Sequence, residues 1–432
     1  MRTLMRSSLL GTALCLTTLA APRADAQTIA ITGGKVYTVS GAPIENGTVV
    51  IRDGKIVAVG ANVAVPEGAQ RIDATGKWVT PGLVNASTVL GLSEISAVTG
   101  TNDATARGRD NVAAAFQVAD GLNPTSILLS PTRGDGITAV VIHPDDGLFA
   151  GQSAVFEIVD GSASDMIVKQ SAAMVANLGN PRAVGASSRG EMLMHVREIL
   201  DDARTYARRR ADFERAQTRP FAASRLDLEA LQPVLAGRLP LLVAVDKASD
   251  IEATLRIAKE YGVKVIINGG AEAWMVADKL AAAKVTVLTG AMDNIPRNFN
   301  SLGSRQENAA LLRAAGVSVA LIGNAGGGGE TQFNVRNIRY EAGNAVAYGM
   351  TWDDALRAIT LAPAEIFGVS DRFGSLQAGR DANVVVWSGD PFEFATRAEH
   401  VLVRGKEYRD VSRQDLLMRR YKKLPPDFER TP

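Results

Sequence analysis

The chain has 432 residues, of which 46% are hydrophobic and 22% are charged, and its formal net charge is +1 at pH 7. This balance is typical of a folded globular protein larger than one small domain, and it excludes a fibrous or largely disordered chain. The absence of a basic surplus argues against a nucleic-acid partner.

The first 26 residues have the pattern of a secretory signal peptide. Arg2 and Arg6 precede the short apolar run SSLLGTALCLTTLAA, and residues 24–26 (ADA) match a small-x-small cleavage site. The apolar run is shorter than the roughly 20 residues that a membrane-spanning helix needs. We therefore predict cleavage before Gln27, an exported and periplasmic protein, and no membrane anchor after cleavage.

The predicted cleavage also changes the chemistry available to the mature chain. Cys15 is the only cysteine, so the mature chain would have neither disulfide bonds nor thiolate metal ligands. Residues 1–26 contain three arginines and one aspartate, and their removal changes the formal net charge from +1 to −1.

Two segments with strand patterns lie far apart in the sequence. Residues 28–78 contain alternating apolar stretches, and Asp53-Gly54 between two of them is a strong hairpin signal. Residues 374–391 and 400–408 again have strand patterns joined by glycine turns. We expect these two segments to form one module from both ends of the chain.

The intervening sequence alternates strand-like and helix-like stretches. Short apolar runs that end in polar or glycine residues occupy residues 136–144, 239–247, 263–270, 285–291 and 317–325. Helical patterns follow several of them, which indicates parallel β/α units and a (β/α)8 barrel. A doubly wound open sheet is the alternative, but no GxGxxG motif follows a strand, so nothing indicates dinucleotide binding.

We therefore predict an α/β protein, with a TIM-like (β/α)8 barrel and a small β-sandwich formed from both chain ends. Residues 187–219, within the barrel segment, have the pattern of a long charged helix or helix pair. The predicted domains are the signal peptide (1–26), the composite β-sandwich (27–79 and 367–415), the barrel (80–366) and a C-terminal tail (416–432).

Functional side chains of such barrels lie at the carboxyl ends of the strands and in the loops that follow. Polar residues at these places give two sets of candidates. The candidates for acid–base catalysis are Asp246, Lys247, Glu272 and Asp293. The candidates for ligand binding are Asn85, Ser87, Asn268, Trp274, Asn294 and Asn324.

Several of these candidates have structural alternatives. Asn85 and Ser87 can hydrogen-bond their own turn, as short polar side chains often do. Asp246 can cap the helix that follows it, and Glu272 can be an acid in the first turn of a helix. Trp274 can be a core residue. The sequence leaves these alternatives open.

Three motifs carry a resemblance to a known family. KWVTPGLVNAS (77–87) resembles the entry strand of the amidohydrolase superfamily. LRAITLAPAEIFGV (356–369) and RFGSLQAGRDANVVVWSGDPFE (372–393) resemble its last barrel helix and its closing β-sandwich. The resemblance covers roughly residues 28–410 and is greatest to imidazolonepropionase-like exported amidohydrolases. It implies a hydrolase of non-peptide C–N bonds on a metal-dependent barrel.

The resemblance also implies a ligand set that this sequence lacks. Such enzymes bind zinc or another divalent metal through His-x-His on strand 1, Lys or Glu on strand 4, a histidine on each of strands 5 and 6, and an aspartate on strand 8. Here the His-x-His positions fall on Ser87 and Val89, the strand-5 position falls near Ala244, and the strand-8 position falls on Asn324. Strand 6 ends in IINGGAEAW without a histidine, and no residue is assigned to strand 4.

The histidine inventory leads to the same expectation. His143, His195 and His400 are the only histidines, and only His143 follows a strand of the predicted barrel. A zinc site needs several imidazole or carboxylate donors at about 2.0–2.2 Å from the ion. We therefore predict no metal site and no cofactor.

Three functional hypotheses follow. In the first, the metal centre is lost and the protein is a pseudoenzyme that binds a small molecule or a partner chain. In the second, it is an active hydrolase of amides, cyclic amides or dipeptide-like substrates, which uses metal-free acid–base residues or an unrecognised metal site. In the third, it is a subunit that partners a metal-competent paralogue.

Overall fold

The computed structural model describes residues 28–106, 111–292, 296, 298–323, 331–411 and 413–422. The predicted signal peptide and the last ten residues of the predicted tail lie outside these ranges. So do three of the candidate site residues, which are Asp293, Asn294 and Asn324.

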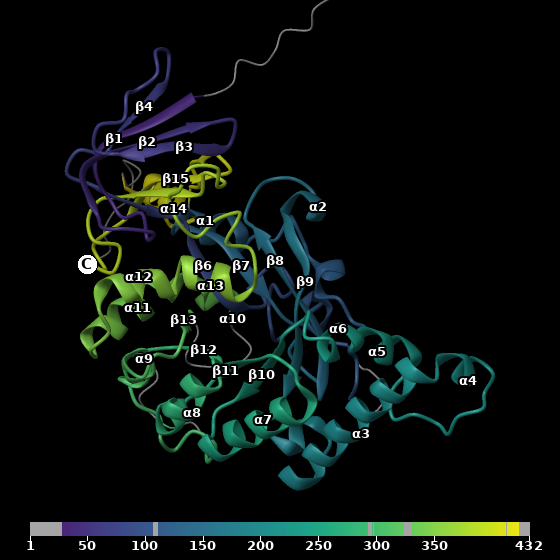
Figure 1. Ribbon diagram of the computed structural model, residues 1–432. Coiled ribbons are helices and arrows are strands. Elements are labelled where there is room, and N and C mark those ends of the chain that lie inside the picture. Colours follow the sequence, from purple (N-terminus) through teal and green to yellow (C-terminus); the bar gives the residue numbers. More distant parts are fainter. Residues whose placement is uncertain are drawn as a thin grey trace, which may run out of the picture.

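Eight strands form a curved sheet that is nearly closed into a barrel, as predicted (Figure 1). In chain order they are β6 (Leu83–Thr88), β7 (Ile137–Ile142), β8 (Phe149–Glu157), β9 (Ile167–Asn177), β10 (Leu241–Val245), β11 (Val265–Gly269), β12 (Thr286–Thr289) and β13 (Val319–Leu321). Neighbouring strands follow the chain order, and β13 returns to contact β6. The carboxyl ends of most strands therefore meet at one end of the barrel.

One strand departs from the predicted all-parallel arrangement. β8 is antiparallel to both of its neighbours, β7 and β9, whereas the other neighbours in the sheet are parallel. Every residue of β8 is buried, so β8 is an integral strand of the barrel sheet and not a surface insertion. β8 therefore begins at the barrel end where β7 and β9 finish.

Helices connect and cover the barrel strands. α3 (Arg189–Arg208) and α4 (Arg210–Glu214) account for the predicted charged helices, and the helical patterns after β10, β11 and β12 are also confirmed. The remaining helices of the barrel region are η1 (Thr99–Thr101), η2 (Val118–Gly121), α1 (Leu129–Gly134), α2 (Ala163–Met166), η3 (Pro181–Val184), α5 (Arg225–Ala230), α6 (Gln232–Leu235), α7 (Ala248–Tyr261), η4 (Ala273–Val276), α8 (Ala277–Ala282), α9 (Asn308–Ala314), α10 (Thr331–Asn334), η5 (Val335–Asn337), α11 (Ile338–Ala347), α12 (Trp352–Ala358) and α13 (Leu361–Ile366).

The second sheet combines strands from both chain ends. They are β1 (Thr28–Val36), β2 (Ile44–Arg52), β3 (Lys55–Gly60), β4 (Gln70–Asp73), β5 (Trp78–Pro81), β14 (Val384–Trp387), β15 (Ala398–Val403) and β16 (Lys406–Tyr408). The two ends of the chain join where β14 pairs with β5. The predicted hairpin is confirmed: Asp53 and Gly54 both have positive φ angles, 52° and 76°, between the paired residues Arg52 and Lys55.

Buried contacts fix this end sheet against the barrel. Glu157 of β8 is fully buried, and its carboxylate accepts hydrogen bonds from Arg404 Nε at 2.6 Å and from Asn383 Nδ2 at 2.7 Å. Trp387 of β14 is also fully buried: its ring packs against Gly136, which directly precedes β7, and its Nε1 donates to Thr80 Oγ1 of the end sheet at 2.9 Å. The barrel and the end sheet therefore share a packed and hydrogen-bonded interface.

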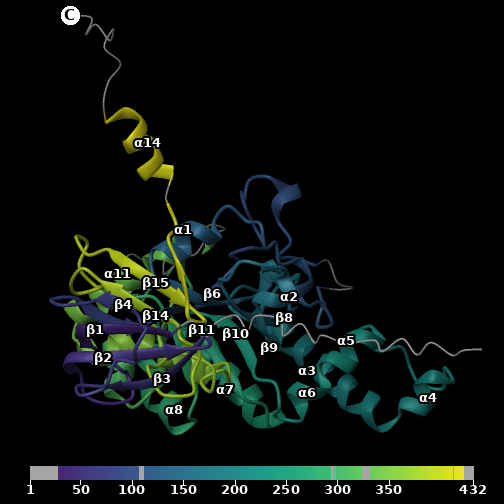
Figure 2. The same ribbon diagram turned by 90° about the horizontal axis from the view of Figure 1, so that it is seen from above.

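A final helix, α14 (Arg413–Tyr421), projects away from the rest of the molecule (Figure 2). It begins within residues predicted to belong to the sandwich and continues into the predicted tail. Over the described residues, the structure contains no helix with the length and apolar character needed to cross a membrane.

Candidate functional site

The candidate site lies where the carboxyl ends of β6, β7 and β11 come together. Ser87 is the second-last residue of β6, His143 directly follows β7, and Asn268 is the second-last residue of β11. Ser87 and His143 are buried, with 5% and 8% of their surfaces exposed. Three side chains from three strands thus meet inside the barrel end, although β6 and β11 are not neighbours in the sheet.

A hydrogen bond joins Ser87 to His143. Ser87 Oγ lies 2.8 Å from His143 Nε2, and His143 Nδ1 lies 3.1 Å from the carbonyl oxygen of Pro144. A carbonyl oxygen can only accept, so in the neutral ring Nδ1 carries the proton and Nε2 accepts from the Ser87 hydroxyl. This is the arrangement in which a histidine can withdraw a proton from a serine.

Asn268 completes the cluster by donating from Nδ2 to Ser87 Oγ at 3.2 Å. The serine hydroxyl therefore donates to His143 and accepts from Asn268. Asn85 has a different role: its Oδ1 accepts from the backbone N–H of Ser87 at 3.0 Å, and its Nδ2 lies 3.4 Å from the Val335 carbonyl oxygen. Asn85 thus hydrogen-bonds its own turn at the end of β6, which is the structural role that the sequence offered as the alternative to ligand binding.

One carboxylate lies close to the histidine. Asp145 Oδ1 is 3.9 Å from His143 Nδ1, beyond hydrogen-bonding distance. Burial raises the pKa of Asp145 above its ordinary value, whereas a positive charge on His143 would lower it. Asp145 can therefore stabilise a protonated His143 electrostatically, but it does not orient the ring. The Pro144 carbonyl does that.

The predicted acid–base residues that follow β10 and β11 make contacts with neighbouring loops and helices. Glu272 is buried, and its two carboxylate oxygens accept the backbone N–H groups of Ala248 at 3.0 Å and Gly303 at 2.9 Å. It therefore ties the start of α7 to a neighbouring loop. Lys247 is the residue before α7, and its side chain makes no cap hydrogen bond with that helix.

Asp246 lines a small hollow of about 50 Å³ at the ends of β10, β11 and β12. Its Oδ1 accepts the backbone N–H of Ala271 at 3.3 Å, so the aspartate holds the loop after β11. Trp274 is half-buried and donates from Nε1 to the Gly303 carbonyl at 2.8 Å, with Arg305 stacked 4.8 Å from its ring centre. Asp246 and Arg305 both line the hollow, and Trp274 adjoins it through Arg305.

The residues present do not fit a divalent metal. Val89 is a buried apolar side chain, and Ala244 pairs with Asn268 across the β10–β11 ladder without a donor atom of its own. Ser87, Asn268 and His143 already satisfy one another and carry no negative charge. Over the described parts of the chain, no group of three or more histidine, cysteine, aspartate or glutamate side chains is placed to hold a metal ion.

The other two histidines lie elsewhere, as expected. His195 is in the middle of α3, and His400 of β15 lies 2.8 Å from Glu407 Oε1 in the end sheet. The pairing of Ser87 with His143 was not predicted. The signal for it was the position of each residue at the end of a strand, on strands that are neighbours in the sheet.

α10 covers the carboxyl end of β6 next to this cluster. Thr88 Oγ1 donates to the Thr331 carbonyl oxygen at 3.0 Å, and Thr331 Oγ1 accepts the backbone N–H of Val89 at 3.1 Å. The next residue, Gln332, is fully buried, and neither its amide oxygen nor its amide nitrogen has a hydrogen-bond partner among the described residues. Buried polar groups are normally paired, so this carboxamide is an exception at the barrel end.

Comparison with known proteins identifies the family. The model of the amidohydrolase family matches residues 191–412, and the chain belongs to this family. A solved amidohydrolase structure from Thermotoga maritima superposes with a TM-score of 0.80 at 27% sequence identity, over 89% of this chain and 100% of that one. The fold predicted from the sequence and its resemblance to amidohydrolases are thereby confirmed.

Curated relatives are more distant in sequence. The amidohydrolase tasK of Hapsidospora irregularis is 23% identical over 393 residues, which are 84% of this chain and 39% of that protein. This chain therefore spans well under half of that relative's length. The imidazolonepropionase of Mesorhizobium japonicum is 22% identical over 376 residues, which are 80% of this chain and 87% of that protein.

Proposed function

We propose that this amidohydrolase-family protein has lost the metal centre of its relatives and binds an amide-bearing small molecule at the carboxyl end of the barrel. The observation that carries the proposal is the neutral cluster of Ser87, His143 and Asn268, in which Ser87 Oγ and His143 Nε2, two atoms that a metal site would need free, are hydrogen-bonded. A dication there would lack counter-charge and would lose the hydrogen bonds among its supposed ligands.

The carboxamide of Gln332, which has no partner among the described residues, supports an amide as the ligand. A primary amide offers a donor and an acceptor side by side, and its natural complement is another amide. Leaving both groups buried and unpaired costs free energy, which a ligand amide could recover on binding. Gln332 belongs to α10, which packs against the same strand end as Ser87.

A second candidate function is metal-independent hydrolysis of such an amide. The 2.8 Å contact between Ser87 Oγ and His143 Nε2 favours it, because this is the geometry of a nucleophile and its general base. Ser87 would attack the carbonyl carbon, His143 would take the hydroxyl proton, and the same proton would then go to the departing nitrogen. Water, giving its proton to His143, would then cleave the Ser87 ester, and His143 would return that proton to Ser87 as the acid leaves.

Two measurements on the purified protein test the proposal. We expect elemental analysis to find less than one transition metal per chain. Amino-acid amides and dipeptides should raise the thermal unfolding midpoint, since a ligand at 100 times its dissociation constant stabilises by about 2.7 kcal/mol. Zinc retained in stoichiometric amount through gel filtration would contradict the loss of the metal centre.

Product analysis separates the two candidates. Binding without turnover leaves the ligand intact after long incubation, whereas hydrolysis through Ser87 would continue in a chelator and stop in Ser87→Ala. Gln332→Leu provides the matched test of recognition, because it should weaken amide binding without touching the Ser87–His143 pair. If Gln332→Leu binds the same ligands with unchanged affinity, Gln332 does not recognise an amide, and that part of the proposal is wrong.

A further inference from the structure

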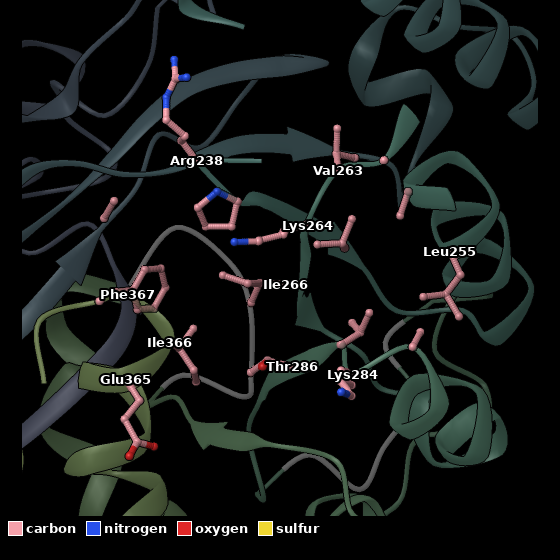
Figure 3. Close-up of a pocket in the computed structure, with 18 of the residues that line it drawn as sticks. Arg238, Leu255, Val263, Lys264, Ile266, Lys284, Thr286, Glu365, Ile366 and Phe367 are labelled. Atoms are coloured by element: carbon pink, nitrogen blue, oxygen red, sulfur yellow. The ribbon is translucent and has the colours of Figure 1, made fainter. Parts of the chain in front are cut away.

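A much larger cavity, of about 840 Å³, opens at the opposite end of the barrel (Figure 3). It is lined by residues at the amino ends of β10, β11 and β12, by the ends of α7 and α8, and by α13. No residue lines both places: along β11, roughly 13 Å of strand separates Lys264 of this cavity from Asn268 of the Ser87 cluster. It is therefore independent of the candidate site described above.

The lining of this cavity is strongly cationic. It includes five positive side chains, Lys169, Arg238, Lys259, Lys264 and Lys284, and one carboxylate, Glu365. Glu365 is already paired with Arg357, whose Nη2 donates to it at 2.5 Å, and Figure 3 shows its carboxylate directed away from Phe367. The whole chain has a formal charge of only +1, so positive charge is concentrated here.

Most of these cations have no protein counter-charge. Within the described ranges, no ion pair engages Arg238, Lys259, Lys264 or Lys284. By contrast, Lys279 in the adjoining helix α8 pairs with Glu252 at 2.5 Å. The cations around the cavity are thus available to a ligand, and their mutual repulsion would be relieved by an anion.

The inner surface of the cavity is apolar. Ile266 and Phe367 are buried, with 5% and 1% of their surfaces exposed, and Ile366 lies beside them. Figure 3 shows the amino group of Lys264 extending into the space on the Phe367 side. Lys169 Nζ donates to the Phe367 carbonyl oxygen at 2.7 Å, and partial burial lowers the pKa of this lysine. Positive charge and apolar surface therefore meet in one cavity.

We propose that this cavity binds a small amphipathic anion, a molecule with an aliphatic or aromatic body and one carboxylate. Its volume falls within the range of about 300–1,000 Å³ that small-molecule sites occupy. The apolar body would lie against Ile266, Ile366 and Phe367, and the carboxylate would accept hydrogen bonds from the amino group of Lys264. A simple inorganic anion would leave the apolar surface uncovered.

Dodecanoate is the probe that tests the proposal, with dodecanol as its uncharged analogue. We expect calorimetry on the purified protein to detect dodecanoate binding and no comparable binding of dodecanol. Lys264→Glu should weaken dodecanoate binding at least tenfold, and Lys264→Gln should weaken it less. Arg52→Glu is the matched control: it makes the same charge change at an exposed position of the end sheet and should leave the affinity within twofold.

Several outcomes would overturn the proposal. These are equal binding of dodecanol, unchanged affinity in both Lys264 variants, or binding of a glutamate-rich peptide in place of dodecanoate, which would make the cavity a protein-docking site. Thermal unfolding of each variant shows whether it is folded. Ser87→Ala should leave dodecanoate affinity unchanged, so failure of this proposal and failure of the proposed function are distinguishable.

Discussion

The two ends of the barrel differ in charge and in available space. At the carboxyl end, polar side chains satisfy one another around Ser87, and the hollow beside them measures about 50 Å³. At the amino end, five cationic side chains, most of them without an ion pair among the described residues, surround about 840 Å³. Barrel enzymes generally keep their ligands at the carboxyl end and reserve the amino end for stability. In this protein, the features that attract a ligand are divided between both ends.

A single strand illustrates how the sequence produces this division. β11 begins just after Lys264, and Asn268 is its second-last residue. Between them, Ile266 and Ile267 are buried in two different clusters, because successive side chains of a strand point to opposite faces. The fold therefore determines where the ends of the strand lie, while the residues at each end determine their charge independently.

The largest expected effect comes from breaking the buried contact that holds the end sheet to the barrel. Arg404→Ala would leave the fully buried Glu157 carboxylate with Asn383 and with Arg372, which is 3.6 Å away. Loss of one partner of a buried charge costs about 3 kcal/mol. We expect urea unfolding to show this loss, with both ends of the barrel unfolding in the same transition.

Arg52→Ala is the control for this loss, because Arg52 is exposed on β2. Surface substitutions of this kind change the free energy of unfolding by less than about 0.5 kcal/mol. A comparably small change in Arg404→Ala would show that the buried carboxylate does not hold the end sheet to the barrel.

A smaller effect should distinguish the carboxyl end from the amino end. Ser87→Ala removes the partner of the buried His143 Nε2 and of the half-buried Asn268 Nδ2. We expect a loss of about 2 kcal/mol in the free energy of unfolding. The exposed Ser249 on α7 provides the matched control, and Ser249→Ala should be nearly neutral. Equal stability of the two variants would mean that the Ser87 cluster is not a closed hydrogen-bond network.

The comparison also shows what could be predicted from the sequence. The alternation of strand and helix patterns and the motifs in 356–393 were sufficient to predict the barrel and the end sheet. Both parts of the fold depend on periodicity and turn residues, which the sequence displays directly. β8 was not predicted as a strand, because its sequence FAGQSAVFE contains glycine, glutamine, serine and glutamate and is not a continuous apolar run. A different limit applies to the joining of Ser87 and His143: their residue types were recognised, but their contact depends on the register of β6 with β7.

The amino-end cavity was missed for a further reason. Lys259, Lys264 and Lys284 are 5 and 20 residues apart, and each alone has the ordinary appearance of a solvated helix or loop lysine. Only the closing of the barrel brings them to one opening. Charge clusters that depend on tertiary packing leave no local pattern, whereas a strand or a hairpin does.

The smallest expected effect concerns Tyr261, the last residue of α7, which directly precedes the cavity residues Gly262 and Val263. Its hydroxyl lies 3.1 Å from Asp201 Oδ1, and burial together with this carboxylate raises its pKa from 10.0 to about 12. The folded state therefore holds the phenol proton more tightly than the unfolded state. The resulting stability is fully present below pH 10 and is lost as pH rises towards 12.

Tyr261→Phe should lower the free energy of unfolding by about 1 kcal/mol at neutral pH, the usual value of one hydrogen bond. The variant should also lose less stability than the wild type between pH 10 and 12, because it has no phenol to ionise there. Ultraviolet absorbance follows the formation of tyrosinate as the pH rises. The titration curves of the wild type and of Tyr261→Phe should differ near pH 12, where Tyr261 ionises. If the two absorbance titrations differ near pH 10 instead, the phenol is exposed, and α7 is not fixed against α3 at the amino end of the barrel.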